Sequence, residues 1–236
     1  LNALLAPSSG QVLYNGQDIF EESAKERRRQ IRQKVGLVFQ YPEHQLFEMT
    51  VWKDVAFGPT NMKLSESEIK ERVEWAMELV GLGPEYYEKS PFDLSGGQKR
   101  RVAVAGVLAM QPEYLILDEP AAGLDPRGRD DLFDRIAMLR DKTGMTVVLV
   151  SHSMEDVARY VDRILVMDHG HLRYDDTPGE VFQHKEELEA MGLAVPKIAE
   201  LGVMLRRKGY DIPKDIIRME EMEDVLVRLF GKEARS

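Results

Sequence analysis

Four short runs of consecutive apolar residues constrain the fold of this chain more than any other feature. They occupy residues 35–39, 114–117, 147–150 and 164–167. Continuous hydrophobicity over four or five residues, without alternation, is typical of strands buried on both faces, as in a parallel sheet between layers of helices. The four runs therefore predict a mostly parallel sheet.

Helical patterns lie between these runs, at residues 64–80, 98–110 and 129–142. In the first, apolar residues recur at helical spacing, and Ser65 followed by Glu68 resembles a capping box. Alternation of strands and helices predicts an α/β fold with flanking helices. Residues 11–19 are predicted to form a small hairpin around Asn15-Gly16, which is a strong turn signal.

Both ends of the chain have a different character. Residues 1–5 predict the tail of a helix, because Pro7 and Gly10 follow a short apolar run. From residue 178 the pattern changes to short amphipathic helices, expected at 180–184, 185–191, 197–208 and 220–230. We expect these to form a helical C-terminal extension.

Composition excludes several classes of protein. The 236 residues contain no cysteine, which rules out a disulfide scaffold, a zinc–thiolate site and a cysteine nucleophile. No apolar stretch approaches the roughly 18–20 residues that span a bilayer. The formal net charge of −9 argues against a protein that binds the phosphate backbone of nucleic acids.

The most specific local motif is Leu94-Ser95-Gly96-Gly97-Gln98, placed directly before an apolar helix. Ser95 is predicted to cap this helix, with Gln98 three residues further on. The two glycines would let a phosphate group approach bare backbone N–H groups at the positive end of the helix. Taken alone, the motif is explained equally well as a capped helix after a glycine-rich turn.

Polar residues follow three of the predicted strands. Asp118 and Glu119 end the run at 114–117, where Asp118 is suited to hold Mg²⁺ and Glu119 to polarise an attacking water. Gln40 follows the first run and could reach the metal and the water. His152 follows the run at 147–150 and could contact a γ-phosphate. Each has a simpler alternative, such as a solvated acidic turn or a structural histidine.

In their order and spacing, these motifs resemble those of the ATP-binding subunits of ABC transporters. Gly123-Leu124-Asp125-Pro126 completes the set. The resemblance implies a P-loop NTPase-like fold over residues 1–176, with a helical subdomain at about 45–112 and a C-terminal extension at 177–236 that helps two ATPases to pair.

The resemblance also implies a role for each motif residue. Gln40 would sense water and Mg²⁺, Asp118 would hold Mg²⁺, Glu119 would act as general base, and His152 would contact the γ-phosphate. Asp125 would connect the two sites of a dimer. The remaining four would close over ATP bound by the opposite subunit: Ser95, Gly96, Gly97 and Gln98.

Three further stretches resemble the ATPases of energy-coupling factor (ECF) transporters, which import vitamins and cobalt or nickel ions. They are residues 41–47, 90–94 and 100–106. The resemblance is greater to the second, A2-type, ATPase. It implies a homo- or heterodimer on the cytoplasmic face of the cell membrane, a transmembrane coupling protein, a separate substrate-binding membrane protein and no nucleic acid. Leu46 and Phe47 could line a groove for the coupling protein, or simply cover the core.

One family motif does not occur in these residues. There is no G-x-x-x-x-G-K-[ST], and Gly231-Lys232 is followed by glutamate. The resemblance implies that residues 1–5 follow such a phosphate-binding loop, so a polypeptide limited to these residues is expected to be inactive and the full-length form active. The alternatives are a pseudo-ATPase without this loop that serves as a structural subunit, and a soluble ABC ATPase acting on DNA or ribosomes.

Overall fold

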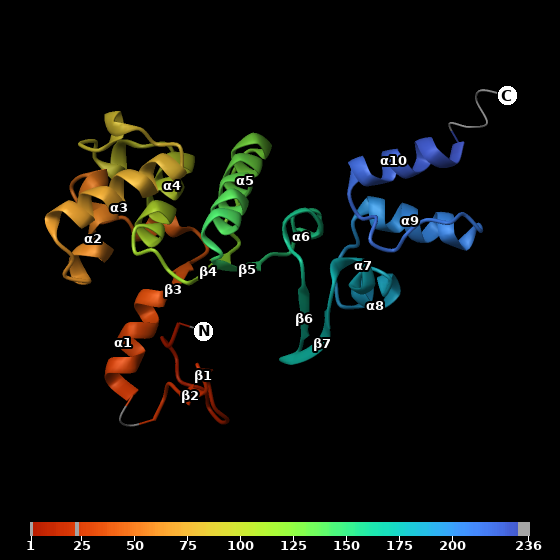
Figure 1. Cartoon of the computed structure of the whole chain (residues 1–236), viewed down its shortest axis with the longest axis horizontal. Helices are drawn as coiled ribbons and strands as arrows, with labels where there is room; N and C mark the ends of the chain where they lie inside the picture. The colour runs from red at the N-terminus through yellow and green to blue at the C-terminus, as the bar shows by residue number, and fades with distance from the viewer. Residues whose placement is uncertain (1, 22–23, 231–236) are drawn as a thin grey trace. The chain divides into compact units, whose positions relative to one another are not determined.

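The computed structural model describes residues 2–21 and 24–230 (Figure 1). The chain divides into two compact units, Leu1–Val150 and Ser151–Ser236. Leu1 and the Gly231-Lys232 pair lie outside the described residues. Among the residues described, no helix is long and apolar enough to cross a membrane.

A three-stranded parallel sheet forms the centre of the first unit. Its strands are β3 (Val35–Val38), β4 (Tyr114–Asp118) and β5 (Thr146–Val150), in the order β3-β4-β5. Val38 pairs with Leu117, and Asp118 pairs with Val150. Three of the four apolar runs thus form the predicted parallel sheet.

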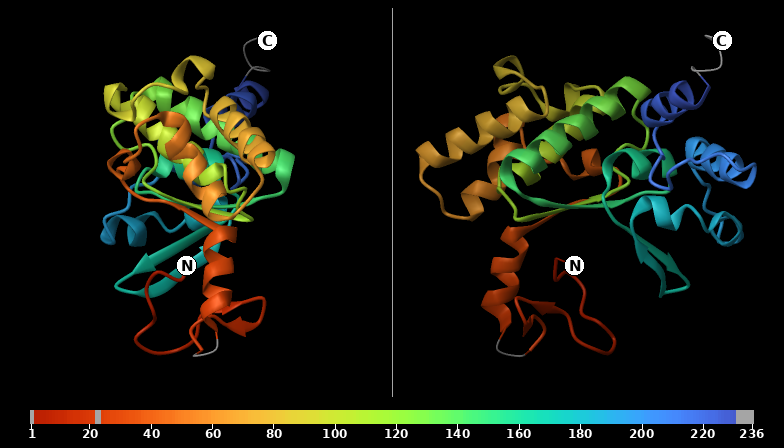
Figure 2. Two further views of the ribbon diagram at one scale, coloured as in Figure 1. Left: turned by 90° about the vertical axis from the view of Figure 1, so that its left-hand side faces the viewer. Right: turned by 45° about the vertical axis from the view of Figure 1, so that its right-hand side comes forward.

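Helices of the first unit lie on both sides of these strands. The helices α2 (Val51–Asn61), α3 (Glu66–Leu79), α4 (Gly96–Leu108) and α5 (Pro126–Thr143) lie on one side, and α1 (Lys25–Lys34) extends from the other (Figure 2). Three short 3₁₀ turns, at Pro42–Gln45, Pro84–Tyr86 and Pro91–Asp93, connect the helices that follow β3. The predicted capping box is confirmed at α3, where Ser65 and Glu68 bond reciprocally. Side chains of α2–α5 and the sheet share the largest apolar core.

The N-terminal segment contains the predicted hairpin but no helix before it. Strands β1 (Leu13–Tyr14) and β2 (Gln17–Asp18) pair antiparallel, with φ angles of 51° at Asn15 and 75° at Gly16. A two-residue hairpin turn of type I′ requires positive φ at both of its residues. The helix predicted at residues 1–5 is wrong for the described residues 2–5, which are irregular. Ala3 has a φ of 60°, which lies outside the right-handed helical region.

The second unit contains a two-stranded sheet and five helices among its described residues. They are α6 (Met154–Tyr160), β6 (Ile164–Asp168), β7 (His171–Asp176), α7 (Pro178–Val181), α8 (Lys185–Ala190), α9 (Lys197–Arg207) and α10 (Met219–Phe230). The helices predicted after residue 178 are confirmed, with their ends shifted by a few residues.

The fourth apolar run does not form a parallel strand. β6 pairs antiparallel with β7, and only alternate residues are buried, so Leu165 and Met167 stay more than half exposed. His169 and Gly170 both have positive φ, which returns the chain directly onto β6. A strand that can pair with its neighbour through such a short turn does not need the long crossover of a parallel pair.

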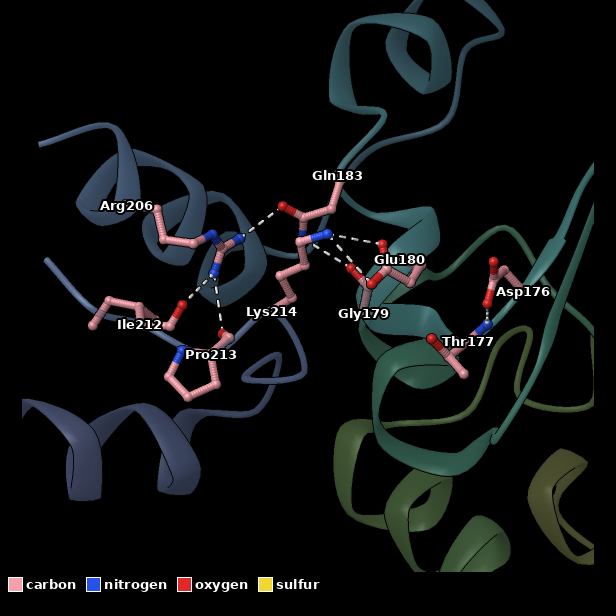
Figure 3. Close-up of polar contacts among 9 residues, drawn as sticks. All are labelled: Asp176, Thr177, Gly179, Glu180, Gln183, Arg206, Ile212, Pro213 and Lys214. Atoms are coloured by element: carbon pink, nitrogen blue, oxygen red, sulfur yellow. Dashed lines mark hydrogen bonds and ion pairs between the residues drawn. The ribbon is translucent and has the colours of Figure 1, made fainter. Parts of the chain in front are cut away.

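The C-terminal helices are joined by polar contacts that the sequence pattern did not predict. The guanidinium of Arg206 donates to the carbonyl oxygens of Ile212 (3.2 Å) and Pro213 (3.1 Å) and to the side chain of Gln183 (2.9 Å) (Figure 3). Lys214 pairs with Glu180 at 3.2 Å. Because α9 is thereby tied to the turn after α7 and to the segment before α10, this unit does not depend on its apolar contacts alone.

Candidate functional site

The carboxyl ends of β3, β4 and β5 lie at one edge of the parallel sheet. Gln40 comes two residues after β3, Asp118 is the last residue of β4, and Glu119 follows it. Gln40 is exposed, and the two acidic residues are partly buried. Open parallel sheets bind ligands at this edge, so the fold places three of the predicted residues where a ligand would bind.

Glu119 has a backbone held in place by its neighbours. Its φ is 47°, in the left-handed region that is uncommon for glutamate. Its N–H donates to the carbonyl of Val150 at 3.0 Å, and its own carbonyl accepts from Ala122 at 3.2 Å. The turn that carries this carboxylate is therefore fixed to the end of β5.

The glycine-rich motif begins α4. Ser95 is the N-cap: its hydroxyl accepts from the N–H of Gln98 at 3.3 Å, and the side chain of Gln98 accepts from the N–H of Ser95 at 3.0 Å. Gln98 also donates to the hydroxyl of Tyr86 at 3.1 Å. The predicted cap is confirmed, whereas binding of a phosphate here stays a prediction.

Among the described residues, neither a close contact nor a special backbone angle explains the two glycines of the motif. Neither Gly96 nor Gly97 has positive φ. A Cβ placed on Gly96 would meet no atom within 4 Å, and one on Gly97 would meet only Leu124, at 3.7 Å. Because Ser95 and Gly96 are also exposed, the bare backbone at the start of α4 is open to a group from outside the chain.

Asp125 caps the next helix, α5. Its carboxylate accepts from the N–H of Gly128 at 3.0 Å, and this hydrogen bond is the main reason why the pKa of Asp125 is lowered. The side chain is otherwise exposed to solvent. A residue predicted to connect two subunits thus also has a structural role in its own chain.

His152 lies in the second unit, two residues after β5, and its side chain is exposed. Its approach to a γ-phosphate at the sheet edge therefore stays a prediction. The described residues contain no cluster of three or more histidine or acidic side chains that could hold a metal ion.

An apolar surface follows the loop of Gln40. Phe47 is 56% exposed and Met49 is 76% exposed. The Phe47 ring meets Phe57 edge-on at 4.9 Å between centroids. Leu46, in contrast, packs against the main core, so the simple explanation of a core-covering residue applies to Leu46 and not to Phe47.

Asp54 holds the backbone of this apolar loop. Its carboxylate accepts from the N–H groups of Phe47 at 3.3 Å and Glu48 at 3.0 Å. Burial raises the pKa of Asp54, although these two hydrogen bonds oppose the shift. The backbone that carries the exposed Phe47 is therefore held by hydrogen bonds to α2.

Arg100 is the residue whose importance the sequence analysis missed. It is 2% exposed, its Nε lies 3.2 Å from a carboxylate oxygen of Glu43, and it donates to the carbonyl of Ala122. Its guanidinium carbon lies 5.9 Å from the centre of the Tyr41 ring. In the sequence, Arg100 is the middle residue of the basic run Lys99-Arg100-Arg101, and nothing local marks it as the buried one.

Comparison with known proteins shows to which family the chain belongs. The profile of the family described as "ABC transporter" matches residues 1–122. The energy-coupling factor transporter ATP-binding protein EcfA2 of Caldanaerobacter subterraneus is 54% identical over 228 residues, covering 97% of this chain and 79% of that protein. EcfA2 of Symbiobacterium thermophilum is 55% identical over 221 residues, covering 94% and 76%.

Two solved structures are also similar to this chain. CbiO1 from Clostridium perfringens, described as part of the ABC transporter complex CbiONQ, is 40% identical with a TM-score of 0.69, covering 85% of this chain and 78% of that one. The ATP-binding cassette MJ0796, solved as a dimer in a post-hydrolysis state with ADP and Pi, is 25% identical with a TM-score of 0.65, covering 75% and 76%. The chain belongs to the ABC transporter family of ATPases. Its curated relatives above are ATP-binding subunits of ECF transporters, and the predicted fold class is confirmed.

Proposed function

We propose that this protein is an A2-type ATPase that powers an ECF-type importer of vitamins or transition-metal ions. The observation that carries the proposal is the placement of Gln40, Asp118 and Glu119 at one sheet edge. In the same unit, the backbone of Gly96 and Gly97 is open to an outside group. The pseudo-ATPase alternative leaves both features without a purpose.

The sheet edge fits the chemistry of MgATP. Mg²⁺ is usually held by one or two carboxylates together with substrate phosphates and waters, so a single Asp118 with the amide of Gln40 is a suitable donor set. When bound, Mg²⁺ would neutralise charge on the phosphates. Glu119 would accept the proton of the attacking water, and its fixed backbone reduces the freedom lost on reaching that geometry. His152 would contact the γ-phosphate.

The start of α4 would complete a site on a second ATPase subunit. A helix N-terminus offers unpaired N–H groups and a positive partial charge to a phosphate. The side chains of Ser95 and Gln98 satisfy only part of these N–H groups. ATP bound by the opposite subunit would therefore draw the two subunits together, with Asp125 carrying the signal between sites.

Phe47 would contact the membrane-embedded coupling protein. A half-exposed aromatic ring beside a second exposed ring, Phe57, is the kind of apolar surface that marks an interaction site. The protein would thus sit on the cytoplasmic face of the cell membrane, and a separate membrane protein would bind the transported substrate.

The test is Glu119→Gln in the full-length protein assembled with its partner ATPase. The amide cannot accept the water proton, so we expect the turnover number for MgATP to fall by about 10²–10⁴-fold, while ATP binding is kept and the closed dimer accumulates. Glu113→Gln is the control, because Glu113 precedes β4 at the opposite end of the strand. Wild-type turnover in Glu119→Gln would remove Glu119 from the role of base.

A further inference from the structure

Arg100 joins three segments of the first unit that are far apart in the sequence. It lies in the second turn of α4, its ion-pair partner Glu43 follows β3, and Ala122 follows β4. Both partner segments start at the sheet edge, directly after Gln40 and Asp118. One buried guanidinium therefore contacts the loop of Gln40 and the loop of Glu119.

The contacts use the shape of the guanidinium as well as its charge. Nε and Nη2 face the two carboxylate oxygens of Glu43 at 3.2 and 3.5 Å, while Nη1 donates to Ala122. A lysine has a single point of charge and cannot satisfy the carboxylate and the carbonyl in this fork geometry. The arrangement therefore specifies arginine.

Ala122 links Arg100 to the turn of Glu119. The N–H of Ala122 donates to the carbonyl of Glu119 at 3.2 Å, and its own carbonyl accepts from Arg100. On the other side, the ring of Tyr41, the residue next to Gln40, lies under the same guanidinium. A displacement of either loop would therefore break a contact of Arg100.

We propose that Arg100 is a positioning residue that makes the start of α4 respond to the loops of Gln40 and Glu119. This inference rests on the proposed function. A change at the nucleotide-bound sheet edge would move Glu43 or Ala122, and Arg100 would pass the movement to α4, whose first residues face the other subunit's ATP. Buried ion pairs contribute little net stability compared with apolar packing, so stability alone does not account for a buried arginine here.

Arg135 in α5 provides a matched control. It also forms an ion pair with a carboxylate (Asp131, 2.9 Å) and donates to a backbone carbonyl (Leu79, 3.2 Å). Neither of its partners belongs to the sheet edge. Arg135→Gln therefore removes the same kinds of contact without touching the loops of Gln40 and Glu119.

The experiment measures the turnover number and the KM for MgATP in the assembled complex. The variants are Arg100→Gln, Gln40→Ala, the two together, and Arg135→Gln, each with its melting temperature. We expect Arg100→Gln to lower the turnover number at least about tenfold with KM changed less than about threefold. In the Gln40→Ala background, adding Arg100→Gln should lower the turnover number by less than about a further threefold, because both changes interrupt the same coupling between the Gln40 loop and α4. Arg135→Gln should keep wild-type turnover and lose less thermal stability than Arg100→Gln, because the Arg135 side chain is 33% exposed.

Two results would overturn the positioning role. One is turnover of Arg100→Gln within threefold of wild type, and the other is an equal loss with and without Gln40. If Arg100→Gln does not fold, Glu43→Gln takes its place in the same cycle, since it keeps the shape of the side chain and removes the charge. A wild-type complex without ATPase activity would instead refute the proposed function itself, and this inference with it.

Discussion

Gly96→Ala should make the protein more stable and less active. No atom lies within 4 Å of a Cβ built on Gly96, and its φ is not in the left-handed region. The folded chain can therefore accept alanine without strain, while the unfolded chain loses conformational freedom. Substitutions of this kind stabilise by about 0.4–1 kcal/mol. For a chain of this size, that corresponds to a rise of roughly 1–4 °C in melting temperature.

The same methyl group should interfere with ATP. If the opposite subunit's phosphates approach the bare N–H groups at the start of α4, a Cβ on Gly96 occupies part of the space they need. Overfilling a closely packed contact costs about 1–3 kcal/mol, which is about 5- to 150-fold in kcat/KM. Stability and activity are thus expected to change in opposite directions.

The assay compares Gly96→Ala with Gly106→Ala in thermal unfolding and in steady-state ATP hydrolysis by the assembled ATPase dimer. Gly106 lies on the same helix, and its added Cβ would make only ordinary contacts at 3.8–3.9 Å with α2. The control should melt higher and retain its activity. Wild-type ATP hydrolysis by Gly96→Ala would show that no outside group approaches this backbone. A lower melting temperature would contradict the argument on stability.

Three further predictions concern the neighbouring features. Ser95→Ala should lower the free energy of unfolding by about 1 kcal/mol, because the helix cap is lost. Ser95→Asp keeps the cap, but its charge should repel phosphate and prevent ATP-driven dimerisation; dimerisation of this variant at the wild-type level would contradict the prediction. Because the pKa of Asp125 is lowered, its stabilising effect should be complete above the unfolded pKa of about 3.9 and be lost as the pH falls through the lower pKa of the folded state. Asp125→Asn should remove that part of the pH dependence in acid melts. Phe47→Asp should leave ATPase activity of the dimer intact but abolish transport in reconstituted vesicles, and normal transport would refute the docking role of Phe47.

The features predicted correctly from the sequence are those that depend on neighbouring residues. The capping boxes of Ser65 and Ser95 each need one hydroxyl and one side chain three residues later, so the sequence pattern already contains the whole interaction. The Asn15-Gly16 turn likewise depends only on backbone preferences at two positions. The carboxyl edge of the sheet was predictable because parallel strands must end on the same side.

What the sequence did not reveal depends on pairing between distant residues, or on a choice between partners. Arg100 and Glu43 are 57 positions apart, and no local pattern couples them. The run that forms β6 is as apolar as those of the parallel strands, but the His169-Gly170 turn supplies a nearer partner. Apolar content indicates that a strand forms, whereas the available partner decides how it pairs.

Backbone strain at the sheet edge connects the candidate catalytic residues with Arg100. Tyr41 and Glu119 have left-handed backbones, with φ of 56° and 47°, and each directly follows a residue proposed to contact Mg²⁺. Such a conformation costs about 1–2 kcal/mol in a residue with a Cβ. Arg100 contacts the ring of Tyr41 and the turn that follows Glu119. Strained conformations persist where surrounding contacts over-determine them. Arg100 supplies such contacts to both turns at once, so we expect a change in one strained loop to alter the contacts that restrain the other.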